Sequence, residues 1–299
     1  MSAALALLPD FALILLGAGL RRVLHLGDHF WAGLEKLIYF VLFPALLFGG
    51  LVKTQIDWAT AGPLLGVAAG SMANGMLLGF GARLFRLSPI SFASQYQCAF
   101  RFNSYVGLAV AGTLHGIDGI AAMGIVVGVM VPPANIAAVW MLARHGELSV
   151  WRELAKNPLV LATLAGLACN TAGFNAPMPL QQFLGRLADA AIALGLLAVG
   201  AGLRPPGQKV GAGATAAALY LLLVKLVLLP VAALAMIRWM GMTGMHADVA
   251  LLFAALPTAS SAYILAQRMG GDGPRVAWLI SAGTLLAMLT LPIWIAYLR

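Results

Sequence analysis

Ten stretches of about 20 apolar residues follow one another along the chain, and they constrain its fold more than any other feature. A helix needs about 20 apolar residues to cross a bilayer. The stretches are rich in Leu, Ala and Gly and show no two-residue alternation, so we expect helices rather than strands. They cover residues 3–20, 33–52, 60–82, 91–113, 117–143, 157–173, 183–203, 211–238, 246–267 and 274–298, numbered here as spans 1 to 10.

The composition supports this interpretation. The 299 residues are 62% hydrophobic and only 9% charged, whereas roughly a quarter of the residues in a soluble domain are charged. Cys98 and Cys169 both lie in apolar stretches and offer neither a disulfide framework nor a metal-binding spacing. The N-terminal stretch lacks the basic start of a signal peptide and is expected to be the first span. The sequence therefore predicts an all-α polytopic membrane protein.

The basic residues predict the orientation in the membrane. Connections that follow odd-numbered spans carry twelve Lys and Arg residues, whereas the other side carries four. Because basic residues concentrate on the cytoplasmic side, we expect both termini on the non-cytoplasmic side of the cell's inner membrane. The net charge of +8 is then a topology signal and not a nucleic-acid site. The two sets are Arg21, Arg22, Lys36, Arg83, Arg86, Arg144, Arg152, Lys156, Arg204, Lys209, Arg268 and Arg275 against Lys53, Arg186, Arg238 and Arg299.

The longest polar connection, residues 144–157, divides the chain into two predicted halves, 1–145 and 146–299, of five spans each. A duplicated half with an odd number of spans inserts upside down relative to its partner. This arrangement is typical of transporters with inverted repeats, whose binding sites lie at interrupted helices in matching positions. We therefore expect two inverted five-helix repeats.

The fourth span of each half is its most polar one. Span 4 contains QYQCAFRFNSYVGLAVAG, and span 9 contains LPTASSAYILAQRMGG. Pro257 removes a backbone donor and clashes with the preceding turn, so span 9 should break or kink there. Thr258, Ser260 and Ser261 can then bond freed backbone groups or contact a ligand. No nucleotide-binding loop, metalloprotease motif or nucleophile elbow occurs, so we expect no enzyme, no cofactor and no metal site.

Four segments resemble the auxin efflux carrier family, in the superfamily that also contains the bile-acid symporters. They are NPLVLATLAGLACN, LADAAIALGLLAVGAGL, KLVLLP and AALPTASSAYILAQRMG. The resemblance implies ten helices in two inverted repeats, with broken helices 4 and 9 crossing each other. It also implies a scaffold of helices 1, 2, 6 and 7, which can form a homodimer, and a transport unit of helices 3–5 and 8–10.

Span 4 departs from the family pattern at one position. Family members carry a proline two residues after a glycine, and this proline breaks the helix. Here Gly107 is kept, but Ala109 stands where the proline would be, and Asn103 lies four rather than five residues before the glycine. We therefore expect Gly107 and the Asn103–Ser104 pair to loosen this helix more gently than a proline would.

Polar side chains in the two interrupted spans are the candidate substrate-binding residues. Charged residues inside a membrane usually face a bundle interior or water and mark a substrate path. The alternatives for Arg101 are snorkelling to an interface and a bond to helix carbonyls. Small polar residues also serve as plain interhelical hydrogen bonders, and Pro257 can kink a helix without contacting a ligand. The candidates are Arg101, Asn103, Ser104, Gly107, Pro257, Thr258, Ser260, Ser261 and Tyr263.

Three further ionisable residues lie in or near apolar spans. Lys225 precedes Pro230 by five residues, where the family also places a cation, and it is expected to support the site. Asp189 and Asp10 could carry a proton through a transport cycle, or each could be a static hydrogen-bond partner. These residues are the candidates for support or coupling.

Taken with the resemblance, the site predicts a secondary carrier for a small organic anion such as a mono- or dicarboxylate, with proton or sodium coupling as an option. Two alternatives stay open: a sodium-coupled symporter of the bile-acid branch, and a membrane receptor that binds without transport. The sequence decides neither the substrate nor the direction of transport.

Overall fold

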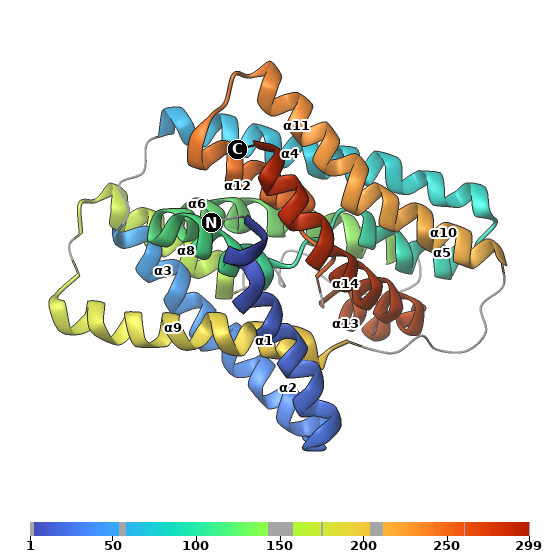
Figure 1. Cartoon of the computed structure of the whole chain (residues 1–299), viewed down its shortest axis with the longest axis horizontal. Coiled ribbons are helices and arrows are strands. Elements are labelled where there is room, and N and C mark those ends of the chain that lie inside the picture. Colours follow the sequence, from blue (N-terminus) through green and yellow to red (C-terminus); the bar gives the residue numbers. More distant parts are fainter. Residues whose placement is uncertain are drawn as a thin grey trace. The chain divides into compact units, whose positions relative to one another are not determined.

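A computed structural model describes residues 3–53, 58–142, 158–174, 176–203, 212–259 and 261–298 (Figure 1). Every regular element in these ranges is helical, and no strand occurs in them. The predicted all-α fold is therefore confirmed for the described part of the chain. The polar connection at 144–157 lies outside the described residues.

Six of the described helical stretches are long and apolar enough to cross a membrane. The largest, Pro89–Leu142, has 54 residues and includes predicted spans 4 and 5. The ten-span count itself stays a prediction, because other predicted spans correspond to shorter helices such as the 14-residue α8 (Pro158–Thr171). The remaining stretches are Asp28–Lys53, Ala61–Phe85, Met178–Ala201, Ala214–Trp239 and Gly273–Tyr297.

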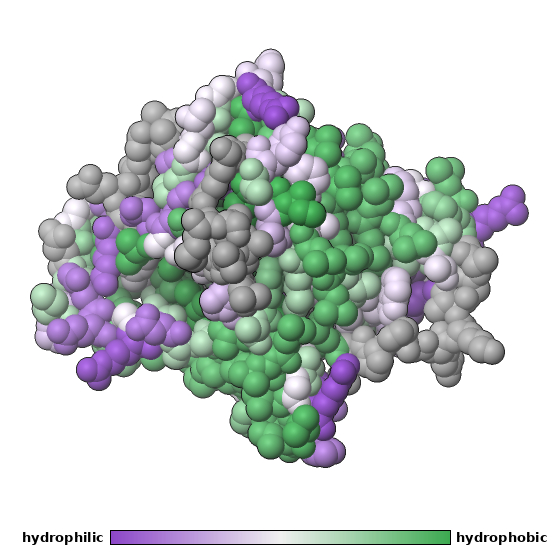
Figure 2. Space-filling view, in the orientation of Figure 1, coloured by the Kyte–Doolittle hydropathy of each residue, from purple (hydrophilic) through white to green (hydrophobic). Residues whose placement is uncertain are grey.

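Large apolar side chains are also abundant on the outside of the molecule. Figure 2 shows hydrophobic residues over much of the visible surface. Leu77, Phe183 and Leu289 expose 70%, 59% and 67% of their surface. A soluble protein rarely exposes so continuous an apolar surface, so these side chains suit contact with lipid. The chain is a multi-pass membrane protein.

The chain folds into two units, each made of segments that are distant in sequence. Unit 1 comprises Met1–Gly62, Tyr105–Val131 and Trp151–Gly202, and unit 2 comprises Pro63–Ser104, Pro132–Val150 and Leu203–Arg299. Each unit contains segments from both predicted halves. The division into repeats at 1–145 and 146–299 stays a prediction.

Unit 1 is built around three packed pairs of helices. Helix α1 (Ala3–Val23) packs along α9 (Met178–Ala201), and α3 (Phe43–Lys53) packs against α8 and α9. Gly17 and Gly200 allow α1 and α9 to approach closely, because a Cβ atom at either position would overlap a backbone carbonyl of the other helix. Small residues serve this purpose commonly in membrane helices. Helix α2 (Asp28–Leu37) continues into α3 through a π-helical turn, η1 (Ile38–Leu42).

Helix α6 (Ser104–Leu142) contains a sharp kink, and its residues 105–131 belong to unit 1. The kink lies at Gly116, whose φ of 60° and ψ of −143° suit glycine alone. This position falls between the predicted spans 91–113 and 117–143. The chain therefore changes direction there without a separate loop.

Unit 2 contains the remaining helices, several of which are joined end to end. Helix α10 continues through a π-helical turn, η5, into α11, and α12 packs against both α11 and α14. Helix α13 also packs on α14, and η3 contacts η5. The bounds are α4 Trp58–Gly79, η2 Phe80–Phe85, α5 Pro89–Tyr96, η3 Gln97–Ala99, α10 Ala212–Leu223, η5 Val224–Leu228, α11 Leu229–Trp239, α12 Gly244–Ala255, α13 Ser261–Arg268 and α14 Gly273–Leu298.

Candidate functional site

The helical path between α12 and α13 is interrupted at Pro257. Helix α12 ends at Ala255, and Leu256 is extended, with φ −59° and ψ 141°. Proline disfavours helical geometry in the residue before it and has no N–H to donate. The sequence therefore ends the helix locally, and the helical path resumes at Ser261.

A second interruption lies between η3 and α6, and it contains no proline. Residues 100–103 are not helical, although Phe100 and Arg101 both donate their backbone N–H to the Gln97 carbonyl. Regular helix resumes at Ser104 and includes Gly107 and Ala109. The interruption thus lies N-terminal to Gly107, where the sequence predicted a loosened helix. The helix is fully broken at residues 100–103 and not merely loosened.

Hydrogen bonds join the two interruptions within unit 2, and we call residues 97–104 together with the described residues of 256–262 the junction. The Asn103 N–H donates to the Pro257 carbonyl at 2.8 Å. The Thr258 hydroxyl donates to the Cys98 carbonyl at 2.9 Å, and Gln97 Nε2 donates to the Ala262 carbonyl at 3.2 Å. Backbone groups freed by the breaks are therefore satisfied by the other segment, as buried backbone groups must be in a membrane.

Arg101 lies across the junction and is 8% exposed. Its guanidinium donates to Gln97 Oε1 at 3.2 Å, to Asn135 Oδ1 at 3.0 Å and to the Ser261 hydroxyl oxygen at 3.0 Å. These three acceptors are neutral side-chain oxygens, and together they fix the orientation of the guanidinium. A buried, oriented cation of this kind can attract an anion.

Asn135 is the member of this group that the sequence analysis missed. It lies in α6 two residues after Pro133, in the part of that helix that belongs to unit 2. An available signal was an amide side chain shortly after a Pro-Pro pair in an otherwise apolar span. Nothing in the sequence, however, pairs Asn135 with Arg101, which is 34 residues away.

Other predicted substrate-binding residues lie at or near the junction. Asn103 and Thr258 are buried, with 2% and 4% exposure, and Ser104 is half-buried at the start of α6. The Tyr263 hydroxyl accepts a hydrogen bond from Gln267 Nε2 at 3.0 Å. Ser260 lies outside the described residues.

Lys225, predicted to support the site, is 4% exposed and lies in η5. This turn contacts η3, α12 and α14, so Lys225 belongs to the elements that surround the junction in unit 2. The π-helical geometry here is of a kind that often marks functional positions.

Three predicted residues lie in unit 1 instead. Gly107 is buried in regular helix, and Asp10 in α1 is 8% exposed and accepts a hydrogen bond from the Thr113 hydroxyl at 3.0 Å. Asp189 is exposed on α9. The structure thus divides the predicted residues between the two units and brings only the unit 2 members together.

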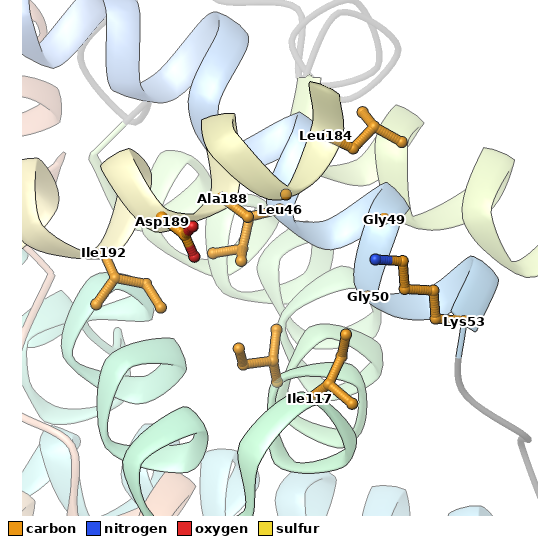
Figure 3. Close-up of a pocket in the computed structure, with 11 residues that line it drawn as sticks. Leu46, Gly49, Gly50, Lys53, Ile117, Leu184, Ala188, Asp189 and Ile192 are labelled. Carbon is orange, nitrogen blue, oxygen red and sulfur yellow. The ribbon is translucent and has the colours of Figure 1, made fainter. Parts of the chain in front are cut away.

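Asp189 lines a cavity of about 230 Å³ in unit 1 (Figure 3). Helices α3, α6 and α9 supply its wall, which is apolar except for Asp189 and Lys53. The Asp189 carboxylate comes from the α9 side and the Lys53 side chain from the end of α3. The lining residues are Leu46, Gly49, Gly50, Lys53, Ile117, Ile120, Leu184, Gly185, Ala188, Asp189 and Ile192.

Comparison with known proteins gives two matches. The family described as "Membrane transport protein" matches residues 142–295, about half of the chain. A protein of Rhizobium meliloti (strain 1021) with the name "Putative malonate transporter" is 28% identical over 299 residues, which cover 95% of this chain and 92% of that protein. The similarity to that protein therefore extends over both units.

Proposed function

Because the chain belongs to the membrane transport protein family, the auxin efflux carrier family that its sequence resembles, we propose that it is a secondary carrier for a small organic anion. It is a transporter and not an enzyme. Mono- and dicarboxylates are the proposed substrate class, and malonate is the first compound to test because of the name of the Rhizobium relative.

The proposed architecture is ten transmembrane helices in two inverted repeats, with the junction as the crossing of helices 4 and 9. Helices 1, 2, 6 and 7 would form the scaffold, which can form a homodimer, and helices 3–5 and 8–10 the transport unit. Support comes from the bonds that join residues 97–104 to the Pro257 segment. Alternating access would expose the junction to one side of the inner membrane at a time, with both termini on the non-cytoplasmic side.

The proposed substrate site combines a fixed cation with the starts of two helices. The single observation that carries the proposal is Arg101, buried and oriented by three neutral acceptors at the point where α6 and α13 begin. Helix N-termini carry partial positive charge and suit carboxylates. An anion 4 Å from a guanidinium gains about 4 kcal/mol at an effective dielectric constant of about 20. Ser104, Ser260 and Tyr263 complete the proposed substrate-binding set of unit 2 with Asn103, Pro257, Thr258 and Ser261.

The membrane potential determines in which direction transport of an anion needs coupling to an ion gradient. An anion that leaves an inside-negative cell gains about 2.3 kcal/mol per charge per 100 mV. Efflux of a monoanion can therefore run without a coupling ion, whereas uptake requires cotransport of protons or sodium. Lys225 and Asp10, with Asp189, are the proposed supporting or coupling residues.

Flux of labelled malonate into proteoliposomes tests the proposal. We expect transport that saturates with concentration, and its dependence on an imposed sodium gradient separates a sodium symporter from the other carriers. A receptor would bind malonate or another carboxylate in a thermal-shift screen yet show no flux of any bound acid. Absence of flux for every acid that binds would contradict the proposed function.

Two variants test the role of the junction in this flux. Arg101→Met is expected to reduce flux at least about a hundredfold, because each 1.4 kcal/mol of lost interaction is a factor of ten. Asn103→Ala should reduce it about tenfold, since the backbone bond to Pro257 does not depend on the side chain. The control is Arg186→Met, which removes an exposed arginine on α9. Wild-type flux in Arg101→Met would exclude this residue from the site.

A further inference from the structure

The cavity of unit 1 presents two opposite charges, those of Lys53 and Asp189. Among the residues that the structure describes, neither Lys53 nor Asp189 has a hydrogen bond or an ion pair with the protein. Both line the cavity, and Figure 3 shows their side chains on different sides of it. The Lys53 ammonium group and the Asp189 carboxylate can therefore form hydrogen bonds or ion pairs with a bound solute.

The rest of the lining indicates what kind of solute fits between these charges. Leu46, Ile117, Ile120 and Ile192 supply branched apolar side chains, which favour a short hydrocarbon segment. The cavity of about 230 Å³ is below the usual range for drug-sized ligands, about 300 to 1,000 Å³. A small organic acid is therefore of suitable size.

The two charges also select for the charge of the solute. Lys53 can bind one carboxylate, and Asp189 can accept a hydrogen bond from a donor at the other end of the solute. A second carboxylate at that end would lie beside Asp189. Like charges in contact repel each other, so a dianion is disfavoured.

We propose that this cavity is a binding subsite for small organic acids that carry one negative charge and a hydrogen-bond donor at the opposite end, with Asp189 weakening the binding of dianions. The proposal rests on the proposed function, since it assigns the choice of substrate charge to unit 1. Hydroxy acids and the hydrogen monoanions of dicarboxylic acids share this chemistry.

Calorimetric titration of the purified full chain in lipid nanodiscs at neutral pH tests the subsite. The probes are 3-hydroxypropionate, a monoanion with a terminal hydroxyl, and malonate, which is a dianion at this pH. We expect 3-hydroxypropionate to bind at least about tenfold more tightly than malonate. Equal Kd values for the two acids would overturn the selection by charge.

Substitution of the two charged residues gives opposite expectations. Asp189→Asn keeps an acceptor but removes the repulsion, so malonate should bind about tenfold more tightly while the Kd of 3-hydroxypropionate changes less than about threefold. Lys53→Gln should weaken binding of both acids about tenfold. A ratio of Kd values that Asp189→Asn leaves unchanged would overturn the proposal.

A steric variant locates the binding. Gly185 lines the cavity, and a Cβ atom there meets nothing within 4 Å, so Gly185→Leu adds a side chain at a lining position without a backbone clash. Binding of 3-hydroxypropionate should fall at least about tenfold. The control is Gly19→Leu, at a glycine of α1 that is equally open but does not line the cavity. Unchanged binding in Gly185→Leu would overturn the assignment to this cavity.

These binding measurements do not depend on transport. If the acids bind as expected but no acid is transported in proteoliposomes, the proposed function fails while the subsite stands. If flux occurs but substitution of Lys53, Asp189 or Gly185 leaves the Kd values unchanged, the subsite fails and the carrier proposal stands.

Discussion

The two interruptions at the junction look alike in outcome but differ in cause. The break after Ala255 contains Pro257, which ends a helix by its own covalent structure. The break at 100–103 contains no proline. Asn103 in this break bonds to Pro257, and Cys98 and Gln97 just before it bond to Thr258 and Ala262. One proline therefore accounts for two breaks: it acts directly on its own segment and through hydrogen bonds on the other.

This difference explains how a chain with Ala109 in place of the family proline can still have a broken helix. Regular helix continues through Gly107 and Ala109, and the non-helical residues lie before Ser104. Backbone groups freed at 100–103 bond to partners in the Pro257 segment, so the break needs no local helix breaker. Three substitutions test this comparison.

Ala109→Pro is expected to have the largest effect. A proline inside a regular helix costs about 3 kcal/mol or more, because it removes a hydrogen bond and clashes with the preceding turn. We expect the free energy of unfolding, measured with denaturant, to fall by about that amount. Ala109→Gly, the control, should cost about 1 kcal/mol. If the proline were tolerated, the helix would already be open at residue 109 and the comparison would fail.

Pro257→Ala should have the next largest effect, and it acts on the opposite segment. Without the proline, Leu256 can become helical, and the carbonyl of residue 257 can then bond within a longer α12 instead of accepting from Asn103. Hydrogen exchange in peptides spanning 100–106 should rise at least about tenfold, equivalent to about 1.4 kcal/mol. The control is Pro292→Ala, which removes a proline inside unbroken α14. Exchange that stays at the wild-type rate would mean that the 100–103 break does not depend on Pro257.

Thr258→Val is expected to have the smallest effect. It keeps the shape of the side chain and removes the hydrogen bond to the Cys98 carbonyl. Thermal unfolding should report a loss of about 1 kcal/mol. Thr243→Val is the control, because Thr243 is exposed and its side chain makes no capping bond at the start of α12. A loss no larger than in this control would remove Thr258 from the bonds that join the two segments.

Sequence reasoning succeeded where a residue acts on its own neighbours. It identified the break at Pro257, where α12 ends at Ala255, and it placed a boundary between two spans near Gly116, where the structure has a kink. Each depends on the steric limits of a single residue or on the transfer free energy of neighbouring side chains, and both can be inferred from a few consecutive residues.

Sequence reasoning failed where the role depends on a distant partner. Asn135 drew no attention, although it accepts a hydrogen bond from Arg101. The sequence assigned Asp10, Asp189 and Lys225 to the same group, as ionisable residues in or near apolar spans. The structure places the two acids in unit 1 and the lysine in unit 2. Periodicity shows that a charge lies in a span but not which other spans it faces.

The sequence by itself determined that this protein is helical, that it resides in a membrane, and that one helix ends at Pro257. These properties follow from the transfer free energy of apolar side chains and from the geometry of single residues. Only the tertiary structure decided that residues 100–103 leave the helix, that Asn135 and Ser261 hold Arg101, and that Lys53 and Asp189 line one cavity. Those arrangements depend on contacts between residues up to 165 positions apart in the sequence, and no local pattern records them.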